Sequence, residues 1–228
     1  MKKIKHSLVN GIVKEIVPRI YCAQIDDDYD RAMLFCRYQE FYESPYKKFR
    51  GKPFTWMEYM RFYKDAWKKR VFTYPDDWAG YNIPCNVLQK ANHIFCYDTE
   101  YDKIMNDIYF YCAIDSQNKN DGTRCDWYLI GASSKDIKTM DHEIAHGLYY
   151  TNKVYKKIVN NLINDIKPTH YDKLKKKLIK MGYVDDKKII DDEIQAFMST
   201  GLYNGLDTKE LKKYETEFIK NFKKYNNG

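Results

Sequence analysis

The sequence contains no long apolar run, no secretory signal and no paired-cysteine motif. Its 228 residues include no stretch of 18 or more apolar side chains, so a transmembrane helix is not expected. Polar residues such as Asn10 and Lys14 interrupt the apolar core that a signal peptide needs after a basic start. Six scattered cysteines without a Cys-x-x-Cys spacing favour reduced, buried thiols over a disulfide framework. We therefore expect an intracellular, cytoplasmic protein without a membrane partner.

The net charge of +7 gives little support to a nucleic-acid partner. Residues 126–228 hold 19 basic and 15 acidic side chains, and the first 125 residues hold 20 and 17. We therefore expect the excess to be spread evenly along the chain. Lysine runs such as Lys175–Lys177 are expected to coat exposed helix faces.

The segment His142-Glu143-Ile144-Ala145-His146 carries the most specific chemical pattern in the chain. On a helix, residues four apart project from the same face, so both imidazoles can bind one tetrahedral metal ion. Glu143 lies close enough along the helix to reach a water molecule bound to that ion. This arrangement predicts metal-assisted peptide hydrolysis. The alternative is that both histidines are ordinary surface or core residues.

A helix from about Ser134 to Tyr150 is expected to carry this pattern. Ser133 and Asp136 resemble a helix-capping pair, and apolar residues follow at helical spacing. The histidines point away from that apolar stripe, toward a predicted cleft. The preceding segment Cys125–Gly131 is rich in β-branched and aromatic residues and is predicted to be a strand that leads into the helix.

A third metal ligand must come from further along the chain. Tyr149 and Asn152 stand where a glycine and a third histidine would follow the second histidine, so an acidic ligand is required. Glu193 has apolar neighbours three and four residues away on both sides, whereas Asp191 and Asp192 border a solvated edge. A carboxylate among aliphatic groups needs a cation, so Glu193 is the predicted ligand. A buried ion pair with Lys or Arg is the alternative.

These segments resemble the gluzincin branch of the zinc metallopeptidases, which includes thermolysin-like and lethal-factor-like enzymes. In that branch, His-Glu-x-x-His is followed by a helix with Glu-x-x-Ala or Glu-x-x-x-Asp. Five residues match: His142, Glu143, His146, Glu193 and Ala196. The resemblance implies Zn²⁺ bound by both histidines and Glu193, Glu143 as general base, and a peptide or protein substrate. Phe197 occupies the position of the aspartate, so another group must orient one histidine.

A side-chain donor is also expected to stabilise the oxyanion that forms during hydrolysis. The candidates are His170, Tyr149, Tyr183 and Tyr203, and the sequence does not rank them. For His170, the alternative is an ordinary surface histidine near the start of a helix.

The sequence predicts a helix-rich α+β fold with a small sheet before the helix that carries the histidines. Residues 1–91 form an aromatic-rich helical region, with helices expected over Asp28–Glu43 and from Thr55 to about Lys69. Residues 92–228 are expected to form a zincin-like metallopeptidase domain, as the resemblance implies. The last third of the chain is predicted to form four helices: Asn152–Ile166, Pro168–Met181, Val184–Thr200 and Asp207–Tyr225.

Two other functions are compatible with these patterns. One is a non-catalytic zinc-binding structural or interaction protein, such as a virion component, but such a protein has no need for Glu143. The other uses the arginines and aromatic residues between Tyr29 and Tyr81 to bind a protein or a single-stranded nucleic acid. An ordinary aromatic core explains the same composition.

Overall fold

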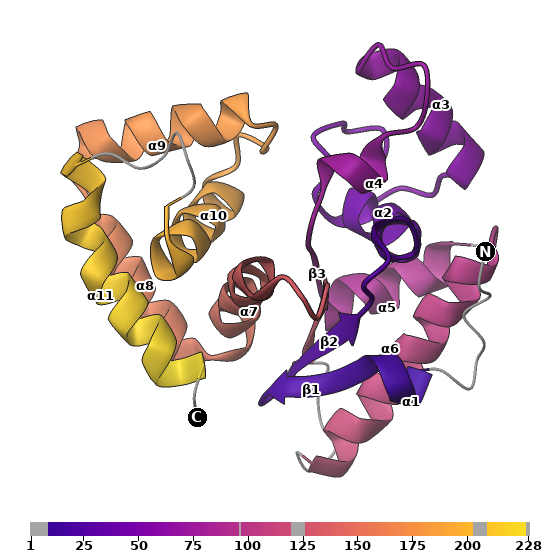
Figure 1. Cartoon of the computed structure of the whole chain (residues 1–228), viewed down its shortest axis with the longest axis horizontal. Coiled ribbons are helices and arrows are strands. Elements are labelled where there is room, and N and C mark those ends of the chain that lie inside the picture. The colour runs from indigo at the N-terminus through magenta and orange to yellow at the C-terminus, as the bar shows by residue number, and fades with distance from the viewer. Residues whose placement is uncertain (1–8, 96, 120–125, 203–208, 227–228) are drawn as a thin grey trace. The chain divides into compact units, whose positions relative to one another are not determined.

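The computed structural model describes residues 9–95, 97–119, 126–202 and 209–226 (Figure 1). Its elements are mainly helices, with one four-stranded sheet, so the helix-rich α+β class is confirmed. The chain forms two compact units, Met1–Met140 and Asp141–Gly228, which are called unit 1 and unit 2 below. No helix among the described residues is both long and apolar enough to cross a membrane.

The sheet of unit 1 combines strands from three distant parts of the sequence. Its order is β1 (Val13–Val17), β2 (Ile20–Gln24), β4 (Tyr128–Ala132) and β3 (Tyr81–Pro84). Strands β1 and β2 are antiparallel, β2 and β4 are parallel, and β3 and β4 are antiparallel. The predicted strand before the motif helix is therefore β4, and it lies inside the sheet.

Six helices of unit 1 are described. The α2 helix has the predicted bounds, and Thr55 and Glu58 form the predicted capping box at the start of α3. A short helix, α4, lies between α3 and β3. The helices are α1 (Val9–Ile12), α2 (Asp28–Glu43), α3 (Trp56–Ala66), α4 (Tyr74–Asp77), α5 (Cys85–Ile94) and α6 (Glu100–Lys119).

The aromatic residues of unit 1 mainly form its core. Rings from α2, α3 and the segments around them are buried together, including Phe35, Phe49, Tyr59 and Tyr74. Many of these rings meet edge to face, as Phe49 and Tyr59 do, with centroids 5.1 Å apart. The interpretation of the aromatic density as a core is thus confirmed for most of these residues.

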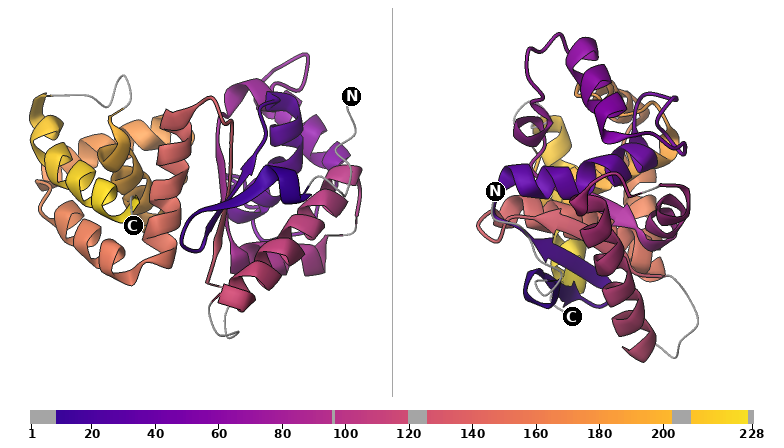
Figure 2. Two further views of the ribbon diagram at one scale, coloured as in Figure 1. Left: turned by 60° about the horizontal axis from the view of Figure 1, so that its bottom comes forward. Right: turned by 90° about the vertical axis from the view of Figure 1, so that its right-hand side faces the viewer.

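Unit 2 is built from helices (Figure 2). They are α7 (Ile137–Thr151), whose first turn belongs to unit 1, α8 (Lys153–Asn164), α9 (Pro168–Lys180), α10 (Lys187–Thr200) and α11 (Lys209–Asn226). Helix α10 packs against α8, α9 and α11. Gly182 and Gly201 have φ angles of 108° and 107°, which explains why glycine follows α9 and α10.

Two features differ from the expectations. The compact units meet at residues 140 and 141 rather than at 91 and 92, because β1, β2 and β3 pair in one sheet with β4. Cys22, Cys36 and Cys112 are free and buried, as expected, but Cys85 is disulfide-bonded. The expectation of reduced cysteines is therefore wrong for Cys85.

Candidate metal centre

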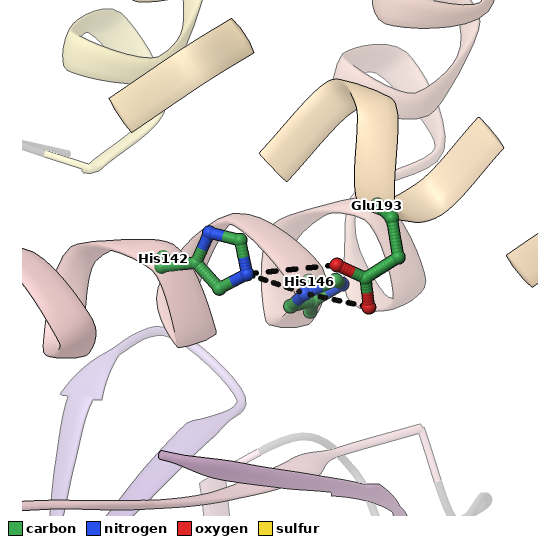
Figure 3. Close-up of side chains that lie close together, drawn as sticks. All are labelled: His142, His146 and Glu193. Atoms are coloured by element: carbon green, nitrogen blue, oxygen red, sulfur yellow. Dashed lines mark hydrogen bonds and ion pairs between the residues drawn. The ribbon is translucent and has the colours of Figure 1, made fainter. Parts of the chain in front are cut away.

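Helix α7 presents His142 and His146 on one side. Asp136 caps the helix: its carboxylate accepts hydrogen bonds from the backbone N–H of Thr139 at 3.1 Å and from its hydroxyl at 2.6 Å. The helix therefore begins at Ile137 and not at about Ser134, as the sequence predicted. The spacing of four residues brings the two Nε2 atoms to 3.3 Å from each other (Figure 3).

Helix α10 supplies the third predicted ligand. Asp186 caps this helix by accepting a hydrogen bond from the backbone N–H of Lys188 at 2.8 Å. Two turns later, Glu193 points toward the histidines and is only 4% exposed (Figure 3). Its Oε2 lies 3.7 Å from Nε2 of His142, and its Oε1 lies 3.6 Å from Nε2 of His146.

These distances fit a tetrahedral zinc ion. Bonds of about 2.0–2.2 Å from zinc to nitrogen and oxygen hold neighbouring ligand atoms about 3.3–3.6 Å apart. The two Nε2 atoms are 3.3 Å apart, and those of His142 and His146 lie 3.7 and 3.6 Å from two different oxygens of Glu193, so these distances are close to the tetrahedral range. Among the described residues, these three form a group that could hold a metal ion, with their ligand atoms within 4.8 Å of one another.

The Glu193 carboxylate gives an independent test of this fit. Its Oε2 is buried and has no hydrogen-bond partner among the described residues, a state that costs about 1–3 kcal/mol or more if nothing binds there. Its ion-pair partners in the described chain are histidines, so the alternative of an ion pair with Lys or Arg does not hold. A cation between the imidazoles would satisfy this oxygen.

A buried hydrogen-bond network holds the His146 ring in place. Nδ1 of His146 lies 2.9 Å from Oδ1 of Asp192, which leaves Nε2 free to bind a metal. The Gln195 amide donates to the same carboxylate oxygen at 3.0 Å and to the carbonyl of Ala145 at 3.1 Å. The Tyr155 hydroxyl donates to the Gln195 amide oxygen at 3.0 Å. The network therefore ties α8 and α10 to the histidine helix.

Asp192 thus takes the orienting role that the sequence left open. Phe197, in the place of the aspartate in the Glu-x-x-x-Asp pattern, packs its ring 4.6 Å from the His142 ring. The prediction that Asp191 and Asp192 lie on a solvated edge is wrong, because their side chains are only 14% and 19% exposed. Asp191 does not contact the histidines: it lies 2.5 Å from Nζ of Lys187 and accepts a hydrogen bond from Tyr171.

The electrostatics of the cluster favour a cation. Burial disfavours the charged imidazole, but the carboxylates of Asp192 and Glu193 outweigh it and raise the pKa of His146 well above its usual value. Burial also raises the pKa of Glu193, but His146 and His142 outweigh this effect and hold that pKa below its ordinary value. A metal ion would take the place of the proton on Nε2 of His146 and would keep the Glu193 carboxylate ionised.

Glu143 lies between the histidines in sequence and is 5% exposed. Its carboxylate is near enough to His146 to contribute to the raised pKa of that imidazole. Tyr183 is the donor candidate that the structure brings to the cluster. Its hydroxyl hydrogen-bonds to Glu193 and helps to lower the pKa of that carboxyl.

Two other donor candidates, Tyr149 and His170, have their hydroxyl or ring contacts away from the candidate metal ligands. The Tyr149 hydroxyl donates to Asn160 on α8 at 2.7 Å. His170 lies near the start of α9, with Nδ1 at 3.4 Å from the Tyr214 hydroxyl. Tyr203 lies outside the described residues.

No protein-family model, curated protein or solved structure matches the chain. The resemblance to gluzincins remains a prediction that rests on the motif residues described above.

Proposed function

We propose that this protein is a zinc-dependent peptidase of the gluzincin type. The observation that carries the proposal is the cluster of candidate ligand atoms from His142, His146 and Glu193, in which the buried Oε2 of Glu193 lacks a hydrogen-bond partner. Two histidines and one carboxylate leave the fourth position of a tetrahedral ion open, as in catalytic zinc sites.

Each residue of the site has a separate task in this proposal. Bound zinc would acidify a water molecule and polarise the scissile carbonyl. The Glu143 carboxylate accepts a proton from the attacking water and passes it to the leaving amine. Asp192 keeps the proton of His146 on Nδ1, and the Tyr183 hydroxyl fixes the Glu193 carboxylate by a hydrogen bond.

A non-catalytic zinc-binding protein is the second candidate. His146 and Glu193 are only 2% and 4% exposed, which leaves little room for a substrate and favours this candidate. The presence of Glu143 beside the ligands favours the peptidase, because a structural site needs no general base. A pair of substitutions separates the two candidates.

The experiment compares Glu143→Gln with His146→Ala. Glu143→Gln should retain zinc, measured by elemental analysis, and lose about a hundredfold to ten-thousandfold in cleavage rate on a peptide library. His146→Ala should lose both zinc and cleavage, because only two protein ligands remain. In the wild type, a chelator should abolish cleavage and added zinc should restore it.

The two possible failures have different meanings. A wild type that binds one zinc per chain but cleaves no peptide in a broad library supports the non-catalytic protein. A wild type that binds no zinc, and whose melting temperature does not rise with added zinc, contradicts both candidates. At a free zinc concentration of 100 times Kd, binding should stabilise the fold by about 2.7 kcal/mol.

A further inference from the structure

The excess positive charge is concentrated in one short segment. Residues 45–71 hold two acidic side chains and nine basic ones, a net charge of +7. The other 201 residues hold thirty basic and thirty acidic side chains, so the expectation of an even spread is wrong. The nine basic residues are Lys47, Lys48, Arg50, Lys52, Arg61, Lys64, Lys68, Lys69 and Arg70.

This segment consists of α3 and the turns on either side of it. Within unit 1, α3 lies at the end away from the sheet (Figure 1). Tyr59 and Tyr63 are buried on its inner face. Met57, Arg61 and Lys64 fall within about 60° of one another on the opposite face, at 100° per residue. Met57 and Arg61 are exposed, so the outer face presents its charge to solvent.

The cations of this segment are not neutralised by neighbours. Within the described parts of the chain, none of the nine forms an ion pair, whereas Arg19, Arg31 and Arg37 each pair with an aspartate. The helix dipole favours cations near the C-terminal end of α3. It therefore does not explain the four basic residues that precede Thr55, before the helix begins. A fold requirement therefore does not account for the whole cluster.

Two partly exposed tryptophans lie in this segment or shortly after it in the chain. Trp67 follows α3 and is 48% exposed, and Trp78 follows α4 and is 36% exposed. Each is backed by a buried ring: Tyr63 lies 6.0 Å from Trp67, and Tyr74 lies 6.2 Å from Trp78. The two tyrosines are themselves 5.5 Å apart. The tryptophans are thus held on a rigid aromatic base.

We propose that residues 45–71 and Trp78, together called the basic aromatic surface, bind single-stranded nucleic acid. Lysine and arginine would contact the phosphates, while bases stack on the tryptophans. Duplexes are a poorer fit because their bases are already stacked. This proposal does not depend on the zinc site.

An anionic membrane is a poorer fit to the same surface. The cations extend from the turn before α3 to the loop after it, and this 11-residue helix alone is about 16 Å long. A membrane anchor needs an apolar face that sinks into the headgroup region. Here Met57 is flanked on the outer face by Arg61 and Lys64, and the tryptophans rest on the core.

The test is binding of a fluorescent 20-nucleotide oligothymidine to the full-length protein at several salt concentrations. The test variant carries Arg61→Gln, Lys69→Gln and Arg70→Gln. The control variant carries Lys176→Gln and Lys180→Gln on α9 and Lys188→Gln on α10. All three lysines are exposed and belong to unit 2. Both variants remove three exposed charges, so only position differs between them.

We expect the slope of log Kobs against log salt to become shallower by about 2 in the test variant, because each phosphate contact contributes about 0.7. The control should keep the wild-type slope. Trp67→Ala should weaken binding by roughly 5- to 100-fold, and Trp67→Phe should restore most of the loss. Melting temperatures show whether Trp67→Ala still folds. If it does not, the comparison of the test and control variants decides the result.

Three results would overturn the proposal. The first is equal loss of binding in the test and control variants, which would indicate a general effect of charge. The second is that the wild-type protein does not bind the oligonucleotide at low salt. The third is tighter binding to phosphatidylserine vesicles or to polyglutamate than to the oligonucleotide, which would assign the surface to a membrane or to an acidic protein.

Discussion

Replacement of Asp192 by asparagine tests whether the metal centre is built as the structure indicates. Asp192 is not one of the three candidate ligands. Its Oδ1 lies 2.9 Å from Nδ1 of His146 and accepts a hydrogen bond from the Gln195 amide at 3.0 Å. Asparagine preserves the volume of the side chain and removes its charge. The substitution therefore alters the orientation and basicity of His146 while leaving every ligand in the chain.

The expected loss can be estimated from the behaviour of such supporting groups. Removing a partner of a ligating histidine typically lowers metal affinity about 10- to 100-fold, or about 1.4–2.8 kcal/mol. Glu193→Gln should cost more, because it removes the charge of a ligand itself. Asp191→Asn is the matched control, since the adjacent carboxylate faces Lys187 and Tyr171 and not the histidines. It should change zinc affinity by less than about threefold.

The assay is competition for zinc against a chromophoric chelator at fixed pH. Nitrogen NMR of the zinc-free protein, in which the wild type should hold a proton on Nδ1 of His146, reports the ring state directly. Equal affinities for Asp191→Asn and Asp192→Asn would refute the assignment of Asp192. If Asp192→Asn bound zinc as tightly as wild type, the His146 contact would have no role in the metal site.

Two further predictions concern the stability of unit 1. Gly131→Ala should lower the free energy of unfolding by about 1–3 kcal/mol in urea, because the new methyl group would lie 2.4 Å from the buried Phe35 ring; an unchanged midpoint would contradict this. Burial raises the pKa of Glu40 above its ordinary 4.5, so its contribution to stability is complete below that pH and is lost as the pH rises through the raised value. Glu40→Gln should flatten this part of the stability curve, and an unaltered curve would show that Glu40 titrates normally.

The helices and the candidate metal ligands could be predicted from the sequence because they depend on local patterns of residues. Capping residues and apolar spacing gave the bounds of α2 and the start of α3, and helical register selected Glu193 over its two acidic neighbours. Register alone did not reveal Asp192 as the partner of His146. That contact depends on how α10 packs against α7, and the sequence of one helix does not determine this.

Long-range pairing explains the other differences. Strand β2 is buried along most of its length, so it lacks the alternation that marks a half-exposed strand, and it pairs in parallel with β4 more than a hundred residues away. The disulfide of Cys85 likewise depends on which cysteines the fold brings together. The even charge balance between the two halves of the chain concealed a local excess over 45–71, because the rest of unit 1 holds 13 basic and 17 acidic residues.

The metal centre and the basic aromatic surface lie in different compact units, and this separation makes the two proposals independently testable. Glu143→Gln changes a carboxylate of unit 2, so it should leave the affinity for oligothymidine and its salt dependence unchanged. The triple substitution at Arg61, Lys69 and Arg70 should leave zinc content unchanged. If it also leaves cleavage of short peptides intact while cleavage of a nucleic-acid-bound protein falls, the surface recruits substrates to the peptidase. If cleavage of both substrates is unaffected, the two units have separate tasks.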